Sequence, residues 1–169
     1  MRVLVVGAGL IGTVYGAHLA AAGNTVSVLS HGPRTGDVAA EGLCARDVLS
    51  GGRADGEAAV VPDASGEYDI VLVAVRRDQL ASACAGLAVL AGEPAIVFFG
   101  NNPAGRAAIA GELPGDVYLG FPGVGGVMTS GLPATSGYGS SRRLCRGHLI
   151  PGWQRWNRRC PAAGSLSGG

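Results

Sequence analysis

Short apolar runs alternate with segments of helical periodicity over the first 120 residues of the chain. The apolar runs are rich in valine, isoleucine and phenylalanine, which is typical of strands buried on both faces of a parallel sheet. Strands are expected at residues 3–6, 25–29, 70–75, 95–99 and 117–119, and helices at residues 11–22, 79–90 and 104–113. This alternation predicts a Rossmann-like α/β fold, a doubly wound parallel sheet whose carboxyl edge binds ligands.

Two stretches fit this pattern less well. Residues 34–41 predict a short helix, and residues 43–49 and 57–61 predict strands around a turn at Gly51 and Gly52. From about residue 128 onward, neither a 3.6-residue nor a 2-residue period is present. We therefore expect an NAD(P)-binding Rossmann domain at residues 1–128 and an irregular or disordered tail at residues 129–169.

The expected tail differs from the rest of the chain in composition as well. It holds both tryptophans, and every charged residue after Asp116 is an arginine. A basic segment with interleaved tryptophan can bind nucleic acid, but this one has no framework of regular elements to present those residues, so no nucleic-acid partner is expected. Arg, Gly, Pro, Ser, Cys and Trp in this mixture are what a shifted reading frame of GC-rich DNA encodes. The expectation is a frameshifted tail on a truncated protein.

Composition excludes several further classes of protein. The 169 residues carry a net charge of +1, which does not favour an acidic partner or nucleic acid. Without an apolar run near the ~18 residues that a membrane helix needs, and without a signal peptide, neither membrane insertion nor secretion is expected. The four cysteines lack zinc-site spacing, so we expect no metal and reduced thiols, as in a cytoplasmic protein. The chain contains arginine but no lysine.

A glycine motif follows the first expected strand. Gly7, Gly9 and Gly12 match G-x-G-x-x-G between a buried strand and a helix, the context in which this motif binds dinucleotides. Gly7 permits a tight turn, Gly9 lets a pyrophosphate approach the backbone, and Gly12 lets helix and strand pack closely. The amides at the helix N-terminus, around Leu10 and Ile11, are expected to hold the phosphates.

The end of the second expected strand selects the cofactor. NAD-binding domains usually place Asp or Glu there, about 20 residues after the motif, to bind the ribose hydroxyls. This chain instead has Ser30 and His31, followed by Arg34. Ser30 can hydrogen-bond a 2′-phosphate, and Arg34 or a protonated His31 can pair with it. NADP(H) is therefore favoured over NAD(H), although Arg34 can equally be a solvated loop charge.

Polar residues follow two further strands. Arg76 and Gln79 come after the strand at residues 70–75, where they can face the cofactor or start the next helix in solvent. Asn101 follows the strand at residues 95–99. Its amide can bind a nicotinamide ribose or a substrate carbonyl, or can serve the turn that Asn-Asn-Pro favours. Residues 120–126 can line the same crevice or form an exit from the sheet.

Five segments, in this order and spacing, resemble the N-terminal domain of the ketopantoate reductase (2-dehydropantoate 2-reductase) family: residues 1–12, 30–33, 73–80, 99–102 and 120–123. The resemblance covers about residues 1–128. It implies an oxidoreductase that uses NADPH to reduce the 2-keto acid ketopantoate in pantothenate biosynthesis. It also implies that Asn101 contacts the cofactor near the substrate. His31 and Arg76 stand where many members have a phosphate-binding arginine and a cofactor-contacting lysine.

The same resemblance implies a helical C-terminal domain with a catalytic lysine, which has no counterpart in these residues. Arginine is a poor replacement because it does not readily give up a proton. We therefore expect the NADPH-binding half of a reductase, inactive by itself, with an apolar face through which it can self-associate. The alternatives are a non-catalytic nucleotide-binding module or truncated pseudogene product, and another Rossmann domain, such as a 6-phosphogluconate-dehydrogenase-like or flavin-binding one.

Overall fold

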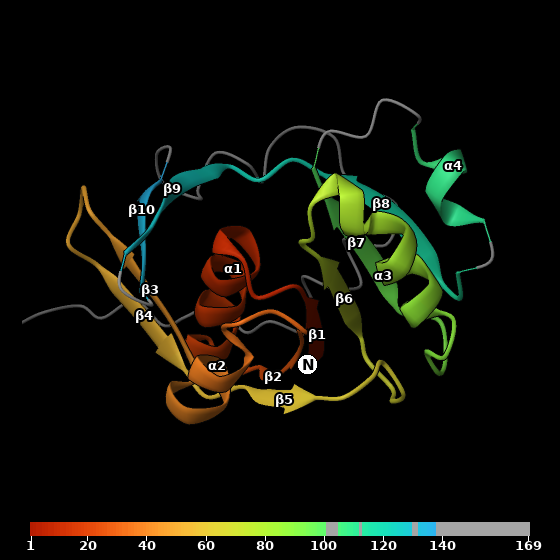
Figure 1. The fold of residues 1–169 in the computed structure, drawn as a ribbon, viewed down its shortest axis with the longest axis horizontal. Coiled ribbons are helices and arrows are strands. Elements are labelled where there is room, and N and C mark those ends of the chain that lie inside the picture. The colour runs from red at the N-terminus through yellow and green to blue at the C-terminus, as the bar shows by residue number, and fades with distance from the viewer. Residues whose placement is uncertain (101–104, 112, 130–131, 138–169) are drawn as a thin grey trace, which may run out of the picture. The chain divides into compact units, whose positions relative to one another are not determined.

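The computed structural model describes residues 1–100, 105–111, 113–129 and 132–137, and its main feature is a parallel sheet with the strand order β5-β2-β1-β6-β7-β8 (Figure 1). The strands are β1 (Arg2–Val6), β2 (Thr25–Leu29), β5 (Ala59–Val61), β6 (Ile70–Val73), β7 (Ala95–Phe99) and β8 (Asp116–Gly120). The helices are α1 (Leu10–Ala21), α2 (Thr35–Glu41), α3 (Leu80–Leu87) and α4 (Ala107–Ala110). Strand order reverses beside β1, which confirms the predicted Rossmann-like α/β fold.

The core lies on both faces of this sheet because its central strands β1, from Val3 onward, and β6 consist of apolar residues. Successive side chains of a strand point to opposite faces. Val3 and Val5 of β1 accordingly pack with Val38 of α2 and with α1, whereas Leu4 packs with Leu87 of α3 on the other face. The two layers of helices therefore hold β1 in the middle of the sheet, with its carboxyl end at the switch in strand order.

Helix α1 ends in a glycine turn, as predicted. Gly23 has φ +82°, a left-handed conformation that favours glycine. Its N–H donates to the Ala20 carbonyl at 2.9 Å, and the Asn24 N–H donates to the Leu19 carbonyl at 3.1 Å. These two bonds are those of a Schellman motif, so they satisfy the last carbonyls of the helix and turn the chain into β2.

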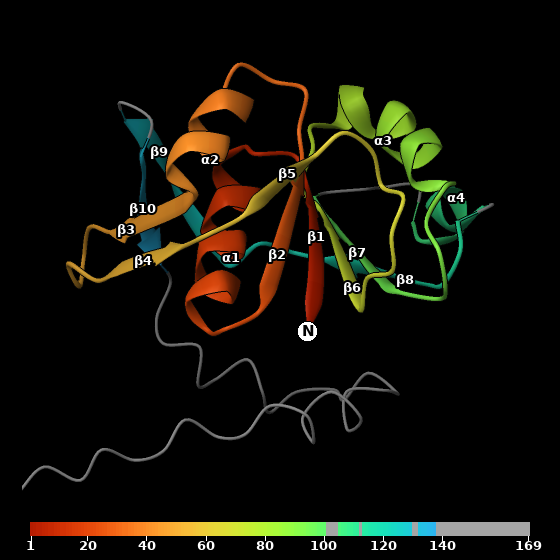
Figure 2. The ribbon, with the colours of Figure 1, turned by 90° about the horizontal axis from the view of Figure 1, so that it is seen from below.

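A second sheet covers the side of α1 that faces away from the main sheet (Figure 2). Its strand order is β4-β3-β10-β9. The strands are β3 (Leu43–Asp47), β4 (Arg53–Gly56), β9 (Val124–Thr129) and β10 (Leu132–Gly137). A Cβ on Gly16 of α1 would lie 2.5 Å from Leu43 Cδ1, and one on Gly56 would lie 2.2 Å from Ala20 Cβ. The small residues thus allow the hairpin of β3 and β4 to pack directly on the helix.

The hairpin and the residues after 128 differ from the sequence-based prediction. The strand opposite β3 is Arg53–Gly56, not residues 57–61, and Ala59–Val61 instead extends the main sheet beside β2. β10 forms where no regular element was expected, because its backbone pairs with both β9 and β3. The boundary at residue 128 stays a prediction, and it falls within β9, one residue before that strand ends. Residues 138–169 of the expected tail lie outside the described residues.

Two expected helices are shorter than predicted. Residues 77–79 form a 3₁₀ turn, labelled η1 (Arg77–Gln79), and α3 ends at Leu87 rather than at residue 90. Of the helix expected at residues 104–113, residues 105–111 and 113 are described, and among them only α4 (Ala107–Ala110) is helical. Within the described ranges, no helix has both the length and the apolar character that crossing a membrane requires.

Candidate functional site

The glycine loop connects β1 to α1 at the carboxyl edge of the main sheet. Helix α1 begins at Leu10, and its N-cap, Gly9, makes no side-chain hydrogen bond to the helix. The first turn of the helix contains no acidic residue. The first amides of a helix have no partner within it, and the helix dipole makes this end positive. The loop therefore offers N–H donors to an anion without a carboxylate to repel it.

Close packing holds the loop in place. The Gly7 N–H donates to the Leu29 carbonyl at the end of β2, at 2.9 Å. Gly7 has φ +98°, and a Cβ there would lie 2.9 Å from the Ala74 carbonyl oxygen, just beyond β6. A Cβ on Gly12 would lie 2.0 Å from the Gly7 carbonyl oxygen. A side chain on Gly7 or Gly12 would therefore collide with neighbouring backbone atoms, whereas a Cβ on Gly9 would have nothing within 4 Å.

A polar turn follows β2. Thr35 Oγ1 donates to the carbonyl of Gly32 at 2.7 Å and to that of Ser30 at 3.0 Å, and the Gly32 N–H donates to Ser30 Oγ at 3.4 Å. His31 is exposed. The first carboxylate after β2 is Asp37, in the first turn of α2. The end of β2 therefore presents a hydroxyl and an imidazole where an NAD-binding domain places an acid.

Arg34 reaches from this turn to the glycine loop. Its Nη1 donates to the Ala8 carbonyl at 3.0 Å and to Thr13 Oγ1 at 3.2 Å, and it lies 3.6 Å from Met128 Sδ of β9. The sequence indicates Arg34 as a phosphate ligand or a solvated charge, and its contact with the loop is a further role that the sequence does not indicate. Sequence reasoning also missed Thr13, although a threonine among the apolar positions of α1 is a signal that a buried hydroxyl has a partner.

Arg76 and Gln79 organise the start of η1. Gln79 Oε1 accepts from the Arg76 N–H at 3.3 Å. The Arg76 guanidinium pairs with Asp78 through Nη2 to Oδ2 at 2.6 Å and Nε to Oδ1 at 3.2 Å, in an exposed position. The hydrogen bond from Arg76 lowers the pKa of the Asp78 carboxyl. The predicted residues are thus at the sheet edge, but Arg76 shares its charge with an acid that sequence reasoning overlooked.

The ends of β7 and β8 lie beside α1. The rings of Tyr15 and Phe99 stack with centroids 4.5 Å apart, and Tyr15 Oη accepts from the Gly123 N–H at 3.4 Å. The chain after β8 therefore passes across the sheet edge toward α1 and then enters β9. Phe121 on this path is 81% exposed. Asn101, predicted to contact a cofactor, lies outside the described residues.

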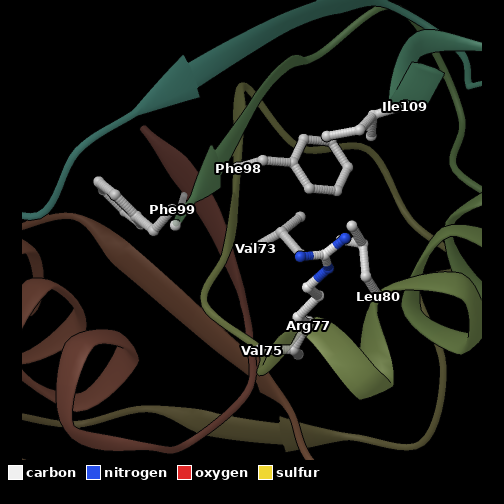
Figure 3. A pocket seen from close by; sticks show the side chains of 8 residues that line it. Val73, Val75, Arg77, Leu80, Phe98, Phe99 and Ile109 are labelled. Carbon is white, nitrogen blue, oxygen red and sulfur yellow. The ribbon is translucent and has the colours of Figure 1, made fainter. Parts of the chain in front are cut away.

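A pocket opens on the opposite side of β6 and β7, next to α3 and α4 (Figure 3). Its side-chain lining is apolar apart from one arginine: Val73, Val75, Arg77, Leu80, Phe98, Phe99 and Ile109. The Arg77 guanidinium points into it, between the Val73 and Leu80 side chains (Figure 3). Sequence reasoning singled out Arg76, yet the neighbouring Arg77 lines this pocket.

The family model described as ketopantoate reductase PanE/ApbA matches residues 3–131 of the chain. The chain belongs to this family. The match includes the glycine loop, the turn after β2, η1 and both strands of the hairpin. The resemblance that the sequence motifs indicated is therefore confirmed. No curated protein matches the chain.

Solved structures share the fold over about half of their length. The 2-dehydropantoate 2-reductase of Methylococcus capsulatus is 28% identical, with a TM-score of 0.64, over 82% of this chain and 46% of that one. The "probable 2-dehydropantoate 2-reductase panE" of Bacillus subtilis is 20% identical, with a TM-score of 0.69, over 82% and 47%. A D-mandelate dehydrogenase, solved with NADH and anilino(oxo)acetate, is 18% identical, with a TM-score of 0.62, over 83% and 46%.

Proposed function

We propose that residues 1–128 are the NADP(H)-binding half of a ketopantoate reductase. The observation that carries the proposal is the uncapped start of α1, which directs free amides toward the carboxyl edge of the sheet, at the switch in strand order. In this arrangement Gly7, Gly9 and Gly12 shape the loop, and the amides of Leu10 and Ile11 bind the pyrophosphate. The open space around Gly9 leaves room for the phosphates to reach the backbone.

The residues after β2 favour NADP(H) over NAD(H). Ser30 and His31 occupy the place of the ribose-binding acid, and no carboxylate precedes Asp37. A carboxylate would repel a 2′-phosphate, whereas a hydroxyl and a protonated imidazole can donate to it. The mandelate dehydrogenase with a similar fold was solved with NADH, so the fold alone does not select NADP(H) and the proposed choice rests on these side chains.

The remaining predicted residues complete the nucleotide site in this proposal. Arg76 and Gln79 lie at the end of β6, beside the glycine loop, where they are expected to contact the nucleotide. Asn101 follows β7 and is expected to contact the nicotinamide end, near the substrate. Bound NADPH supplies a hydride for the reduction of a 2-keto acid in the cytoplasm. The exposed side chain of Phe121, on the path from β8 to β9, then offers apolar surface to a further domain or to self-association.

The absence of lysine favours a second function for these 169 residues taken alone, that of a nucleotide-binding module without turnover. Carbonyl reduction needs a group that protonates or stabilises the developing alkoxide, and arginine does not readily release a proton. We expect the 169-residue chain to bind NADPH but not to consume it when ketopantoate is added. Loss of NADPH absorbance measures the turnover, and steady consumption that depends on ketopantoate would contradict this expectation.

Titration with NADPH and NADH tests the cofactor assignment. We expect the wild-type chain to bind NADPH more tightly, and Ser30→Asp to weaken NADPH binding roughly tenfold or more while NADH binding is retained, because the new carboxylate faces the 2′-phosphate. Leu49→Asp is the matched control, since it adds the same charge at an exposed position in the turn between β3 and β4. Equal or tighter binding of NADH by the wild-type chain would refute the assignment of NADP(H).

A further inference from the structure

The carbonyl of Ala8 is held by two donors inside the glycine loop. Thr13 Oγ1 donates to it at 3.3 Å, and Arg34 Nη1 donates to it at 3.0 Å. Arg34 Nη1 also donates to Thr13 Oγ1 at 3.2 Å, so that the three groups form a closed triangle of hydrogen bonds. Ala8 and Thr13 are buried, at 7% and 0% exposure. Loss of either donor leaves a buried carbonyl less well satisfied, which favours rotation of its peptide.

This peptide also carries the N–H of Gly9. A trans peptide is planar, and its C=O and N–H point in opposite directions. The two donors draw the Ala8 oxygen inward, and the Gly9 N–H therefore points away from them. This N–H makes no hydrogen bond within the described part of the chain, and the space around Gly9 is open. The contacts of Arg34 and Thr13 thus set the direction of a donor that they do not touch.

We propose that Arg34 and Thr13 are positioning residues, which hold the Ala8–Gly9 peptide so that the Gly9 N–H faces the pyrophosphate. The inference rests on the proposed nucleotide-binding function and changes the role of Arg34 within it. The guanidinium thereby supports binding of the pyrophosphate, which NADPH and NADH share, and the discrimination between the two cofactors rests on Ser30 and His31. The charged donor suits this role because hydrogen bonds from an ionised group are stronger than those between neutral groups.

The contact of Arg34 with Met128 connects β9 to this group of hydrogen bonds. Nη1 lies 3.6 Å from Met128 Sδ, while the Arg34 backbone caps α2. One side chain therefore joins the turn after β2, the glycine loop and the second sheet. A lysine at this position has a single ammonium group on a flexible stem, and it reproduces the contacts of Nη1 with Ala8, Thr13 and Met128 less well than arginine does.

Affinities for both cofactors distinguish this role from a direct contact with the 2′-phosphate. The full 169-residue chain and its Arg34→Met and Thr13→Val variants are titrated with NADPH and with NADH, using nicotinamide fluorescence. We expect each variant to weaken both affinities by a similar factor, about five- to tenfold, so that their ratio stays that of the wild-type chain. Thr13→Ser keeps the hydroxyl and is expected to restore most of the affinity that Thr13→Val loses.

A spectroscopic measurement on the nucleotide-free chain tests the geometry directly. The Gly9 amide resonance in a ¹⁵N NMR spectrum is expected to move in Arg34→Met and Thr13→Val, and to stay near the wild-type position in Thr13→Ser. A loss of NADPH affinity alone in Arg34→Met would overturn the proposal in favour of a 2′-phosphate contact. An unmoved Gly9 resonance in Thr13→Val would overturn it as well. If the wild-type chain binds neither nucleotide, the proposed function fails, and the Gly9 resonance still decides the role of the two residues.

Discussion

Replacing Gly12 with alanine is expected to lower the free energy of unfolding by about 3 kcal/mol or more. The new Cβ would lie 2.0 Å from the carbonyl oxygen of Gly7, an atom of the backbone that cannot swing aside as a side chain can. Either the loop opens or α1 moves away from β1, and both changes disturb the core around Val5, whose Cγ1 lies 3.1 Å from the same Cβ. Urea unfolding followed by circular dichroism measures the loss.

Gly36→Ala is the matched control for this substitution. Gly36 lies in α2, and a Cβ there would have nothing within 4 Å. Alanine is a better helix former than glycine, so this variant is expected to be as stable as the wild-type chain or up to about 1 kcal/mol more stable. A Gly12→Ala chain that unfolds within about 0.5 kcal/mol of Gly36→Ala would show that the loop does not pack as described.

Replacing Gly9 with alanine is expected to separate folding from binding. The backbone of Gly9, with φ −74° and ψ −174°, suits any residue, and its Cβ would meet no atom within 4 Å. Stability is therefore expected to change by less than about 1 kcal/mol. The added methyl group projects into the open space that we assign to the pyrophosphate, so NADPH affinity is expected to fall by roughly tenfold or more.

Calorimetric titration with NADPH, together with a melting curve of the same sample, measures both quantities. The two glycine substitutions are expected to differ in kind, because Gly12→Ala acts through the fold and Gly9→Ala acts through the ligand. Unchanged NADPH affinity in Gly9→Ala would contradict the assignment of the loop to the pyrophosphate, whatever its effect on stability.

The first βαβ unit could be predicted nearly to the residue. β2 matches the expected range of 25–29, and α1 ends in the turn at Gly23 that the sequence indicated. Here the local signals agree with the packing: both strands are apolar except at Arg2, Thr25 and Ser27, and glycines stand at both ends of the helix. When local sequence signals and tertiary packing agree in this way, the structure of a segment can be predicted from sequence alone.

The hairpin and β10 could not be assigned correctly because their partners decide their structure. Ala59–Val61 is too short for its pattern to show whether it pairs with β3 or with β2, and the register of Ser27 with Ala59 is a tertiary choice. β10 contains Pro133 and Gly137 and has no alternating pattern. β10 forms because its backbone hydrogen-bonds to β9 and β3, and the pattern of its side chains does not indicate a strand.

The candidate site shows the same division. The roles of Gly7 and Gly12 follow from the motif, and the backbone contacts of both glycines agree with them. The hydrogen bonds of Arg34 to Ala8 and Thr13 join residues far apart in the sequence, so no local pattern could indicate them. The sequence can indicate that a side chain lies at the end of a strand, but the direction in which that side chain points depends on the packing around it.

The pairing of β3 with β10 has a consequence for how the chain folds. Arg46 of β3 pairs with Ala134 of β10, so the edge of β3 stays unpaired until β10, which is synthesised much later, has formed. Contacts this distant in sequence form slowly, because a long loop must close before they are gained. Until β10 arrives, β3 presents a row of unpaired backbone groups to other chains. We therefore expect synthesis and refolding of this protein to pass through a stage in which the edge of β3 is open to other chains, until β10 pairs with it.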